Sequence, residues 1–323
     1  MVARVVMRSG VFAAAIALDI VIGDPQWLPH PVRAIGAAVN ACDQLARDLA
    51  MREHRVAGRI AGIVTTVAVV GGTYRAADWL LRRTGKSATV LESILAASTL
   101  AWRNLMDEVR SVERALESGD LELARRQLAR IVGRDTHELN ETEIARAAIE
   151  TLAESLCDGI VAPLCYLALG GVPLALAYKA VNTLDSMIGH IEPPYRAFGC
   201  SAAKLDDAAN FVPARASALA IVAAAHCSFG NASQSLGVCR RDAGAHRSPN
   251  AGWPEAAIAG ALGVRLGGGN SYDGLLVHAP SIGAEFRAPR AADLPRARQI
   301  VSLAAALLAM TILALLAVRD ALR

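Results

Sequence analysis

The stretch IVSLAAALLAMTILALLAV, residues 300–318, decides the fold class of this chain. It contains no charged residue, and Arg298 and Arg319 flank it. A helix of this length crosses a hydrocarbon core of about 30 Å. A buried helix of a soluble protein is seldom so long and so uniformly apolar. The stretch therefore predicts a membrane-spanning helix.

The composition of the whole chain favours a membrane protein with several spans. Hydrophobic residues make up 54% of the 323 residues and aromatic residues only 4%, so aliphatic side chains supply the apolarity. Further apolar stretches cover residues 11–22, 60–73, 90–102, 160–181 and 212–229. The stretch 160–181 contains Gly170, Gly171 and Pro173, so it is either one kinked span or a re-entrant pair of half-helices. We expect an all-α, polytopic integral membrane helical bundle; the alternative is a soluble, Ala-rich helical enzyme.

The domain organisation expected from this pattern is a single membrane domain over residues 1–323. Residues 103–132 alternate Arg and Glu with apolar residues, which predicts an inserted pair of amphipathic helices. Residues 270–298 contain recurring prolines and predict a loop. The net charge is only +3, and no Lys/Arg cluster is interleaved with aromatic residues. We therefore expect no nucleic-acid partner.

The first polar segment, residues 19–36, follows an apolar stretch. Its prolines and Trp27 predict a rigid turn that presents Asp24, His30 and Arg33. Side chains of these types bind Mg²⁺, transfer protons and bind phosphate, respectively. The alternative is a membrane-interface loop in which His30 is only a hydrogen-bonded turn residue.

The second polar segment begins at Arg134 and continues into an acidic helix. Glu143, Glu150, Glu154 and Asp158 fall within one narrow stripe of that helix at 100° per residue. Charge runs usually mark a solvated helix face, but this one leads directly into an apolar stretch. Carboxylates at a membrane boundary are costly and usually functional, so Glu154 and Asp158 are candidates for binding Mg²⁺ or a substrate amine.

The third segment, residues 178–215, carries oxygen ligands spaced one helical turn apart. They are Asn182, Asp185, Asp206 and Asn210. Such spacing suits Mg²⁺ held together with substrate phosphates, and Lys179 and Arg215 suit the phosphates themselves. Helix capping by Asn and Asp is the alternative.

The fourth segment, residues 240–269, contains a turn that enters a small-residue helix. His246, Asn250 and Glu255 are candidates for proton transfer or nucleotide binding, although Asn250 also suits a helix cap. The helix and the glycines at 267–269 suit close backbone approach, either to a neighbouring helix or to a phosphorylated ligand. The chain has neither a Walker A motif nor a Rossmann fingerprint.

These four segments together resemble the CobD/CbiB family of cobalamin biosynthesis. The resemblance covers about residues 11–275 and rests on Gly-Asp-Pro at 23–25 with Pro-His-Pro-Val at 29–32, Arg-Asp-Thr at 134–136, residues 153–164, residues 178–215 and Gly-Trp-Pro-Glu at 252–255. The chain departs from the family pattern at residues 155–157, where Ser-Leu-Cys stands in place of Asn-Thr-Ser.

The resemblance implies a cell-membrane ligase, adenosylcobinamide-phosphate synthase, that joins adenosylcobyric acid to an aminopropanol phosphate with ATP and Mg²⁺. Its partners would be this corrinoid, the amine, the lipid bilayer and other enzymes of corrin synthesis. The expected catalytic residues are His30, Glu154, Asp158, His246 and Glu255. The expected substrate- or phosphate-binding residues are Arg33, Arg134, Lys179, Arg215 and Asn250. The expected metal ligands are Asp24, Asp185, Asp206 and Asn210.

A single-site ligase needs its acid, base and metal ligands within a few ångströms of one another. We therefore expect the polar loops to converge on one cleft that opens to the cytoplasm, where ATP is present. Two readings from other classes remain open at this point. One is an AmpE-like membrane sensor, signalling or transport protein that uses intramembrane Asp and Glu as relays. The other is a structural scaffold for corrin enzymes.

Overall fold

A computed structural model describes residues 7–25, 30–51, 54–84, 88–189, 195–228, 231–272 and 274–323. The chain divides into two compact units. The first comprises Met1–Ala101, Ala162–Asn210 and Ile312–Arg323; the second comprises Trp102–Val161 and Phe211–Thr311. Each unit is described by itself. The expected single membrane domain over the whole chain stays a prediction.

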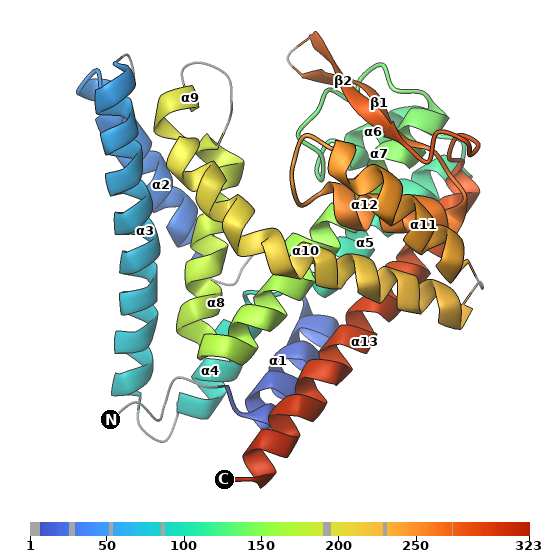
Figure 1. Cartoon of the computed structure of the whole chain (residues 1–323). Helices are drawn as coiled ribbons and strands as arrows, with labels where there is room; N and C mark the ends of the chain where they lie inside the picture. Colours follow the sequence, from blue (N-terminus) through green and yellow to red (C-terminus); the bar gives the residue numbers. More distant parts are fainter. Residues whose placement is uncertain are drawn as a thin grey trace. The chain divides into compact units, whose positions relative to one another are not determined.

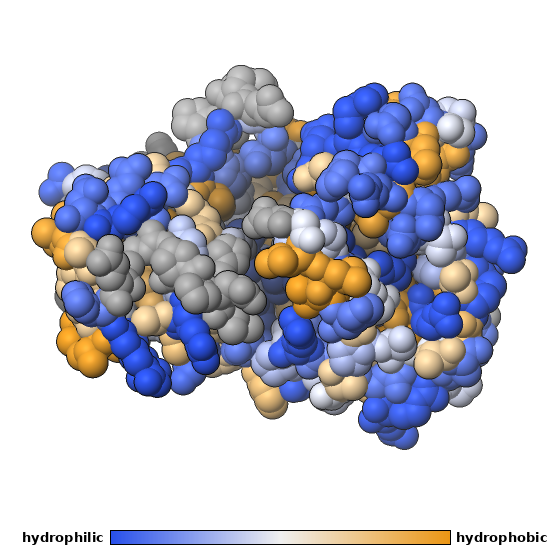
Figure 2. All heavy atoms as spheres, turned by 90° about the horizontal axis from the view of Figure 1, so that it is seen from above, coloured by the Kyte–Doolittle hydropathy of each residue, from blue (hydrophilic) through white to orange (hydrophobic). Residues whose placement is uncertain are grey.

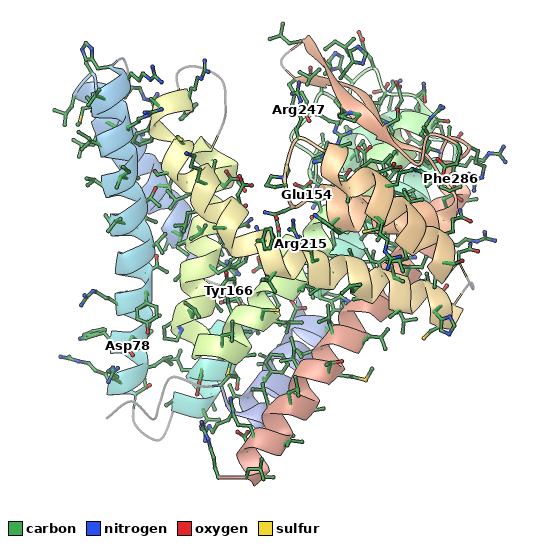
Figure 3. The ribbon with its side chains drawn as sticks, viewed as in Figure 1. Asp78, Glu154, Tyr166, Arg215, Arg247 and Phe286 are labelled. Atoms are coloured by element: carbon green, nitrogen blue, oxygen red, sulfur yellow. The ribbon has the colours of Figure 1, made fainter. Side chains whose placement is uncertain are left out.

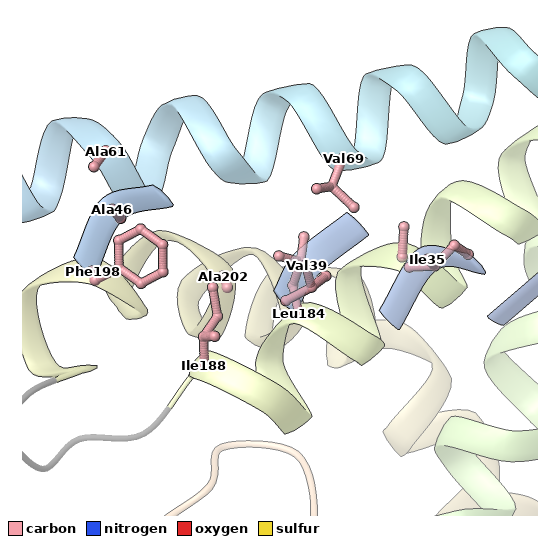
Figure 4. Packing of buried hydrophobic residues seen from close by; sticks show 10 residues of the cluster. Ile35, Val39, Ala46, Ala61, Val69, Leu184, Ile188, Phe198 and Ala202 are labelled. Atoms are coloured by element: carbon pink, nitrogen blue, oxygen red, sulfur yellow. The ribbon is translucent and has the colours of Figure 1, made fainter. Parts of the chain in front are cut away.

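The first unit is built from long apolar helices. They are α1 (Ser9–Ile22), α2 (Pro31–Asp48), α3 (Arg55–Arg83), α4 (Ala88–Ala97), α8 (Ala162–Ile188) and the short α9 (Tyr195–Phe198), with parts of α10 (Cys200–Ser228) and α13 (Leu294–Ala321). The helices α3 and α8 lie side by side, and α2 packs against both (Figure 1). Buried aliphatic and aromatic side chains fill the space between them, among them Val39, Leu184, Ile188 and Phe198 (Figure 4).

Close backbone approach holds α3 against α9 in this unit. A Cβ atom built on Gly62 would lie 1.9 Å from the carbonyl oxygen of Phe198. One turn later, the Thr66 hydroxyl donates to the carbonyl of Gly62 at 2.8 Å and lies 3.0 Å from the hydroxyl of Ser201. Small and hydroxylated residues thus let two helices touch without a bulky side chain between them, as is common in membrane bundles.

We expect Gly62→Ala to destabilise the protein by about 1–3 kcal/mol, because the added methyl group meets backbone atoms that cannot rotate away. The thermal unfolding midpoint in detergent, followed by circular dichroism, checks this expectation. Gly71→Ala is the matched control on α3, since nothing lies within 4 Å of its built Cβ. It should leave the midpoint unchanged or raise it slightly, as Ala is the better helix former. Equal midpoints for both variants would contradict this packing.

Four of the described helices are long and apolar enough to cross a membrane. They lie at Arg55–Arg83, within Glu141–Ile188, at Cys200–Ser228 and within Ala291–Ala321. The last of these contains the stretch quoted first, so the expected multi-pass helical membrane protein is confirmed. The expected interruption of residues 160–181 is also confirmed: Gly170 and Gly171 have non-helical dihedrals, and the φ of Gly171 is +64°. Only glycine adopts such a φ without strain.

The second unit combines shorter helices with one small sheet. Its complete elements are α5 (Trp102–Glu117), α6 (Leu121–Leu128), α7 (Glu141–Leu156), a π-helical turn (Cys157–Val161), α11 (Ala232–Asp242), α12 (Gly252–Leu262), and the strands β1 (Leu266–Tyr272) and β2 (Leu275–Ile282). The expected amphipathic pair over 103–132 is confirmed as α5 and α6, which pack against each other and against α7. A capping box of Asn140 and Glu143 starts α7.

The small-residue helix α12 packs closely against α11. A Cβ atom on Gly260 would lie 2.6 Å from the Cα of Ser235, and the Ser235 hydroxyl donates to the carbonyl of Ala257 at 2.7 Å. Of the two expectations for this segment, approach to a neighbouring helix is therefore confirmed for Gly260, while its location in lipid stays a prediction.

The expected loop over 270–298 is wrong for residues 270–272 and 275–282, which belong to the antiparallel strands β1 and β2, and for residues 294–298, which begin α13. Gly267 and Gly268 have φ values of +78° and +98°, and the strand register shifts there.

Hydrophilic residues predominate over the second unit on the face shown in Figure 2, around a smaller hydrophobic area. The exposed large apolar side chains of the hairpin are Tyr272, Leu275 and Leu276.

Candidate functional site

In the first unit, His30 is fixed at the start of α2. Pro31 occupies the first turn, and the Nδ1 atom of His30 accepts a hydrogen bond from the backbone N–H of Val32 at 3.2 Å. Its Nε2 atom lies 3.6 Å from Oδ1 of Asp24. Burial lowers the pKa of His30; Asp24 opposes this shift, and the positive charges of Arg33 and Lys179 add to it. The lowered pKa favours the neutral imidazole, in which Nδ1 accepts from Val32 and Nε2 carries the proton toward Asp24.

A buried polar cluster in the same unit contains two of the expected metal ligands. The Nδ2 atom of Asn210 donates to Oδ2 of Asp206 at 3.0 Å. The Tyr178 hydroxyl donates to Oδ1 of Asn210 at 2.9 Å, and the ring of Tyr166 stacks on Tyr178 with centroids 4.9 Å apart. Oδ1 of Asp206 is buried and has no hydrogen-bond partner among the described residues. This oxygen is thus placed to accept from a ligand.

The two tyrosines were missed by sequence reasoning. Tyr166 and Tyr178 lie on opposite sides of the Gly170–Gly171 interruption, so no regular helical spacing relates them. In contrast, the spacing of four residues between Asp206 and Asn210 predicted that they share a helix face.

The remaining expected residues of this unit flank that cluster on α8. Nζ of Lys179 lies 3.5 Å from Oδ1 of Asn182, and its charge acts on Asp206. Asp185 is half-buried, and its Oδ1 atom would lie 2.0 Å from a Cβ built on Gly189. A side chain at position 189 would displace the Asp185 carboxylate, so this glycine keeps room for it.

No three His, Cys, Asp or Glu side chains of the described chain lie close enough together to hold a metal ion by themselves. Mg²⁺ does not need such a cage, because it keeps several waters and usually binds one or two carboxylates plus substrate phosphates. The donor set of Asp206 and Asn210, with one unused carboxylate oxygen, fits that mode of binding.

The second unit contains a buried carboxylate bound by two arginines. Glu150 lies 2.8 Å from Nη1 of Arg134 and 3.4 Å from Nη1 of Arg146. Its Oε1 atom also accepts the backbone N–H of Gly267 at 2.8 Å. All three charged side chains are nearly buried, with exposures of 5%, 12% and 10% for Glu150, Arg134 and Arg146. Charge pairing and hydrogen bonds make this arrangement tolerable away from water.

The Arg-Asp-Thr motif that contains Arg134 anchors the hairpin. Arg134 donates to Oδ1 of Asn270 at 2.7 Å, and Asp135 accepts the hydroxyl of Ser271 at 2.6 Å and the backbone N–H of Gly274 at 2.9 Å. Arg134 was expected to bind phosphate; its Nη1 atom donates to Glu150 and Asn270, and the phosphate-binding role stays a prediction.

His246 and Glu255 lie together, as their assignment as a proton-transfer pair requires. Nε2 of His246 is 3.8 Å from Oε1 of Glu255, and Nδ1 accepts the backbone N–H of Ser248 at 3.0 Å. A Cβ atom on Gly252 would lie 2.5 Å from the Cβ of His246, so the glycine of the Gly-Trp-Pro-Glu motif makes room for the histidine.

Burial acts on both members of this pair in opposite directions. It raises the pKa of Glu255 well above its ordinary value, and the negative charges of Glu150 and Glu154 add to the effect. Arg134 and Arg146 oppose it. Burial lowers the pKa of His246. A carboxyl group whose pKa is raised toward neutrality is suited to general acid–base chemistry.

Arg215 is held by aromatic rings and by Asn250. Its guanidinium carbon lies 3.7 Å from the ring centroid of Phe211 and 4.7 Å from that of Trp253. Nη1 donates to Oδ1 of Asn250 at 3.0 Å. The planar group is thus oriented by stacking, and the two expected phosphate-binding residues contact each other. Trp253 and Phe211 had not been assigned a role from the sequence.

Glu154 and Asp158 differ in their surroundings although they share one helix face. Glu154 is exposed near the end of α7, and Figure 3 shows it on the same side of the second unit as Arg215. Asp158 is half-buried in the π-helical turn Cys157–Val161. Such turns occur frequently at functional sites, because the extra residue re-aims side chains. Periodicity alone does not reveal this turn.

The structure therefore sorts the expected residues into two groups. The first unit contains Asp24, His30, Arg33, Lys179, Asp185, Asp206 and Asn210; the second contains Arg134, Glu154, Asp158, Arg215, His246, Asn250 and Glu255. The expected convergence of all these residues on one cleft stays a prediction, as does the role of each.

Comparison with known proteins places the chain in a family. The family model described as CobD/Cbib protein matches residues 12–301. The cobalamin biosynthesis protein CobD of Citrobacter koseri is 44% identical over 295 residues, which cover 90% of this chain and 92% of that protein. CobD of Geobacter metallireducens is 44% identical over 277 residues, covering 84% and 86%. CbiB of Salmonella typhimurium is 43% identical over 295 residues, covering 90% and 92%.

No solved structure matches the chain. The match to the family model spans all four polar segments, and the curated relatives align along nearly their whole length. The chain belongs to the CobD/CbiB family.

Proposed function

We propose that this protein acts in cobalamin biosynthesis as an ATP-dependent ligase, which joins adenosylcobyric acid to an aminopropanol phosphate. The observation that carries the proposal is full-length similarity to proteins named for cobalamin biosynthesis, at 44% identity over 90% of the chain. The acid–base pair of His246 and Glu255 and the stacked Arg215 supply groups that such a reaction needs.

A carboxylate and an ammonium ion do not condense in water without activation. In the proposed reaction, a carboxylate oxygen of the corrinoid attacks the γ-phosphate of ATP, which yields an acyl phosphate and ADP. The amine nitrogen then attacks the acyl carbon, the carbon–oxygen bond to phosphate breaks, and amide and inorganic phosphate form. One proton leaves the ammonium group before attack and a second leaves the nitrogen as the amide forms; phosphate and a base accept them.

The residues of the second unit suit the proton transfers. Glu255, ionised at pH values above its raised pKa, would accept the ammonium proton, with Nε2 of His246 3.8 Å from its carboxylate. Arg215, with its fixed guanidinium plane beside Asn250, suits the phosphate of the amine substrate. Glu154, exposed on the same side, suits the substrate ammonium group.

The residues of the first unit suit the nucleotide phosphates. Mg²⁺, when bound, would neutralise charge on the transferring phosphate. Asp206 would hold it through its unused Oδ1 atom, while Asn210 and Tyr178 fix that carboxylate. Lys179 supplies a positive charge beside it.

An AmpE-like sensor or transporter, the alternative from another class, finds no support. The matching family model and the relatives reported above carry the CobD or CbiB name. We further propose residence in the cell membrane with the site on the cytoplasmic side, where ATP is present.

The test is a product assay on the full chain purified in detergent. The protein is incubated with adenosylcobyric acid, aminopropanol phosphate, ATP and Mg²⁺, and the corrinoids are analysed by mass spectrometry. Adenosylcobinamide phosphate should form only when all four components are present. Failure to form it, with folded protein and intact substrates, would contradict the proposal.

A further inference from the structure

Glu150 is a buried acid paired with two arginines, yet the proposed chemistry does not use it. It is buried at 4% exposure, although the removal of a carboxylate from water is costly. Two arginines and one backbone N–H surround it. A buried network of this kind is strongly organised, and its effect extends to the neighbouring charged groups.

The neighbour that Glu150 acts upon is Glu255. The helices α7 and α12 pack against each other, so the two carboxyl groups belong to one buried region. The other charged or titratable groups acting on Glu255 are Glu154 and Arg146 from α7, Arg134 from the segment before α7, and His246 from the segment before α12. On its other side, α11 faces α12 with Ser235 and with the thiol of Cys239, which donates to the carbonyl of Trp253.

We propose that Glu150 is a positioning residue, which binds Arg134 and Arg146 in ion pairs and thereby weakens the attraction of their positive charges for the carboxyl group of Glu255. Without Glu150, the two guanidinium groups would lack their shared partner and would draw Glu255 into its ionised form. The carboxyl group of Glu255 would then lose its proton at a lower pH. This inference refines the base role given to Glu255 and rests on the proposed function for its catalytic meaning.

The hairpin of β1 and β2 contacts the same buried group of Glu150 and its arginines. Arg146 donates to the carbonyls of Gly267 and Gly269 at 2.7 and 2.8 Å, and Glu150 accepts the N–H of Gly267. A Cβ atom on Gly267 would lie 2.1 Å from the carbonyl of Pro280, so the backbone itself must approach here. Glu150 thus contacts both the hairpin backbone and the two arginines whose charges act on Glu255.

A titration that does not depend on catalysis tests this proposal. The protonated carboxyl of Glu255 is followed by infrared spectroscopy of the full chain in detergent, and its band is identified by its loss in Glu255→Gln. We expect Glu150→Gln to lower the midpoint of this band by about one pH unit, the effect of removing one nearby negative charge. Glu150→Asp should restore most of the shift, because it keeps the charge.

Arg146→Gln supplies the test of opposite sign. It removes a positive charge, so it should raise the midpoint of the Glu255 band, and it serves alone if Glu150→Gln does not fold. Glu141→Gln is the matched control, since Glu141 is exposed in the first turn of the same helix. It should leave the midpoint unchanged.

An unchanged midpoint in folded Glu150→Gln, or shifts of the same sign in Glu150→Gln and Arg146→Gln, would overturn the positioning role. The outcome is separate from the proposed reaction, because the band titrates whether or not amide forms. If the protein is a ligase, the low-pH limb of its kcat/KM profile should also move to lower pH in Glu150→Gln. A merely structural role would reduce activity without moving that limb.

Discussion

Glu255→Gln is expected to lower kcat/KM for amide formation by about a hundredfold or more, because general-base catalysis contributes at least that much. The substitution keeps the size and shape of the side chain but removes the group that accepts the ammonium proton. In the unsubstituted protein, activity should fall as the pH drops through the raised pKa of Glu255, since the base must be ionised. Rates of corrinoid amide formation, measured over a pH series upward from the ordinary glutamate pKa of 4.5, test both effects.

The matched control for this substitution is Glu138→Gln. The Glu138 side chain is 89% exposed, so the same chemical change should leave the rate and the pH profile as they are. Near-normal activity in Glu255→Gln, with a pH profile like that of the control, would remove Glu255 from the proton-transfer role and leave His246 as the candidate base.

Glu154→Gln and Asp158→Asn are each expected to reduce activity by about a hundredfold, which is typical of losing one electrostatic contact to the transition state. Both changes nearly keep the side-chain volume while they remove the charge and replace one acceptor oxygen by an NH2 donor. Expression in the membrane should be retained, since neither carboxylate lies in the buried core. The measurement is kcat and KM for the amine at saturating ATP.

Glu141→Gln is again the control, because it removes a carboxylate charge from the exposed first turn of α7. Near-normal turnover in both Glu154→Gln and Asp158→Asn would restore the interpretation of this stripe as a solvated helix face. A loss in Asp158→Asn alone would assign the role to the π-helical turn.

The membrane-spanning helices were predictable because the length and hydrophobicity of a single stretch of sequence identify them. The stretch 300–318 needs no partner to be recognised, since its length and lack of charge already meet the demand of the bilayer. The interruption at Gly170 and Gly171 was readable for the same reason: two adjacent glycines followed by Pro173 weaken a helix wherever it lies.

The hairpin could not be predicted, because nothing in its first strand alternates. Residues 267–269 are glycines, and Gly267 and Gly268 take φ values that only tertiary contacts select. Its anchors, Arg134 and Arg146, are more than 100 residues away in the sequence. Strand identity here comes from packing rather than from pattern.

Only those contacts of the site that join residues one helical turn apart were predictable from the sequence. The hydrogen bond between Asp206 and Asn210 follows from their separation of four residues. Asn210 pairs with Tyr178, and Glu150 pairs with Arg134. In both pairs the partner lies on another segment of the chain, so helical periodicity does not predict the contact. Glu150 therefore looked like one more acid in a stripe, although burial and two arginines set it apart.

The central claim, that ATP activates the corrinoid carboxylate for amide formation, is tested most directly by isotope transfer. Adenosylcobyric acid with ¹⁸O in the reacting carboxylate is turned over once with aminopropanol phosphate and ATP, and the released phosphate is analysed by mass spectrometry. The proposed acyl phosphate predicts one ¹⁸O atom in inorganic phosphate for each amide formed. Amide formation that leaves the phosphate unlabelled would contradict it.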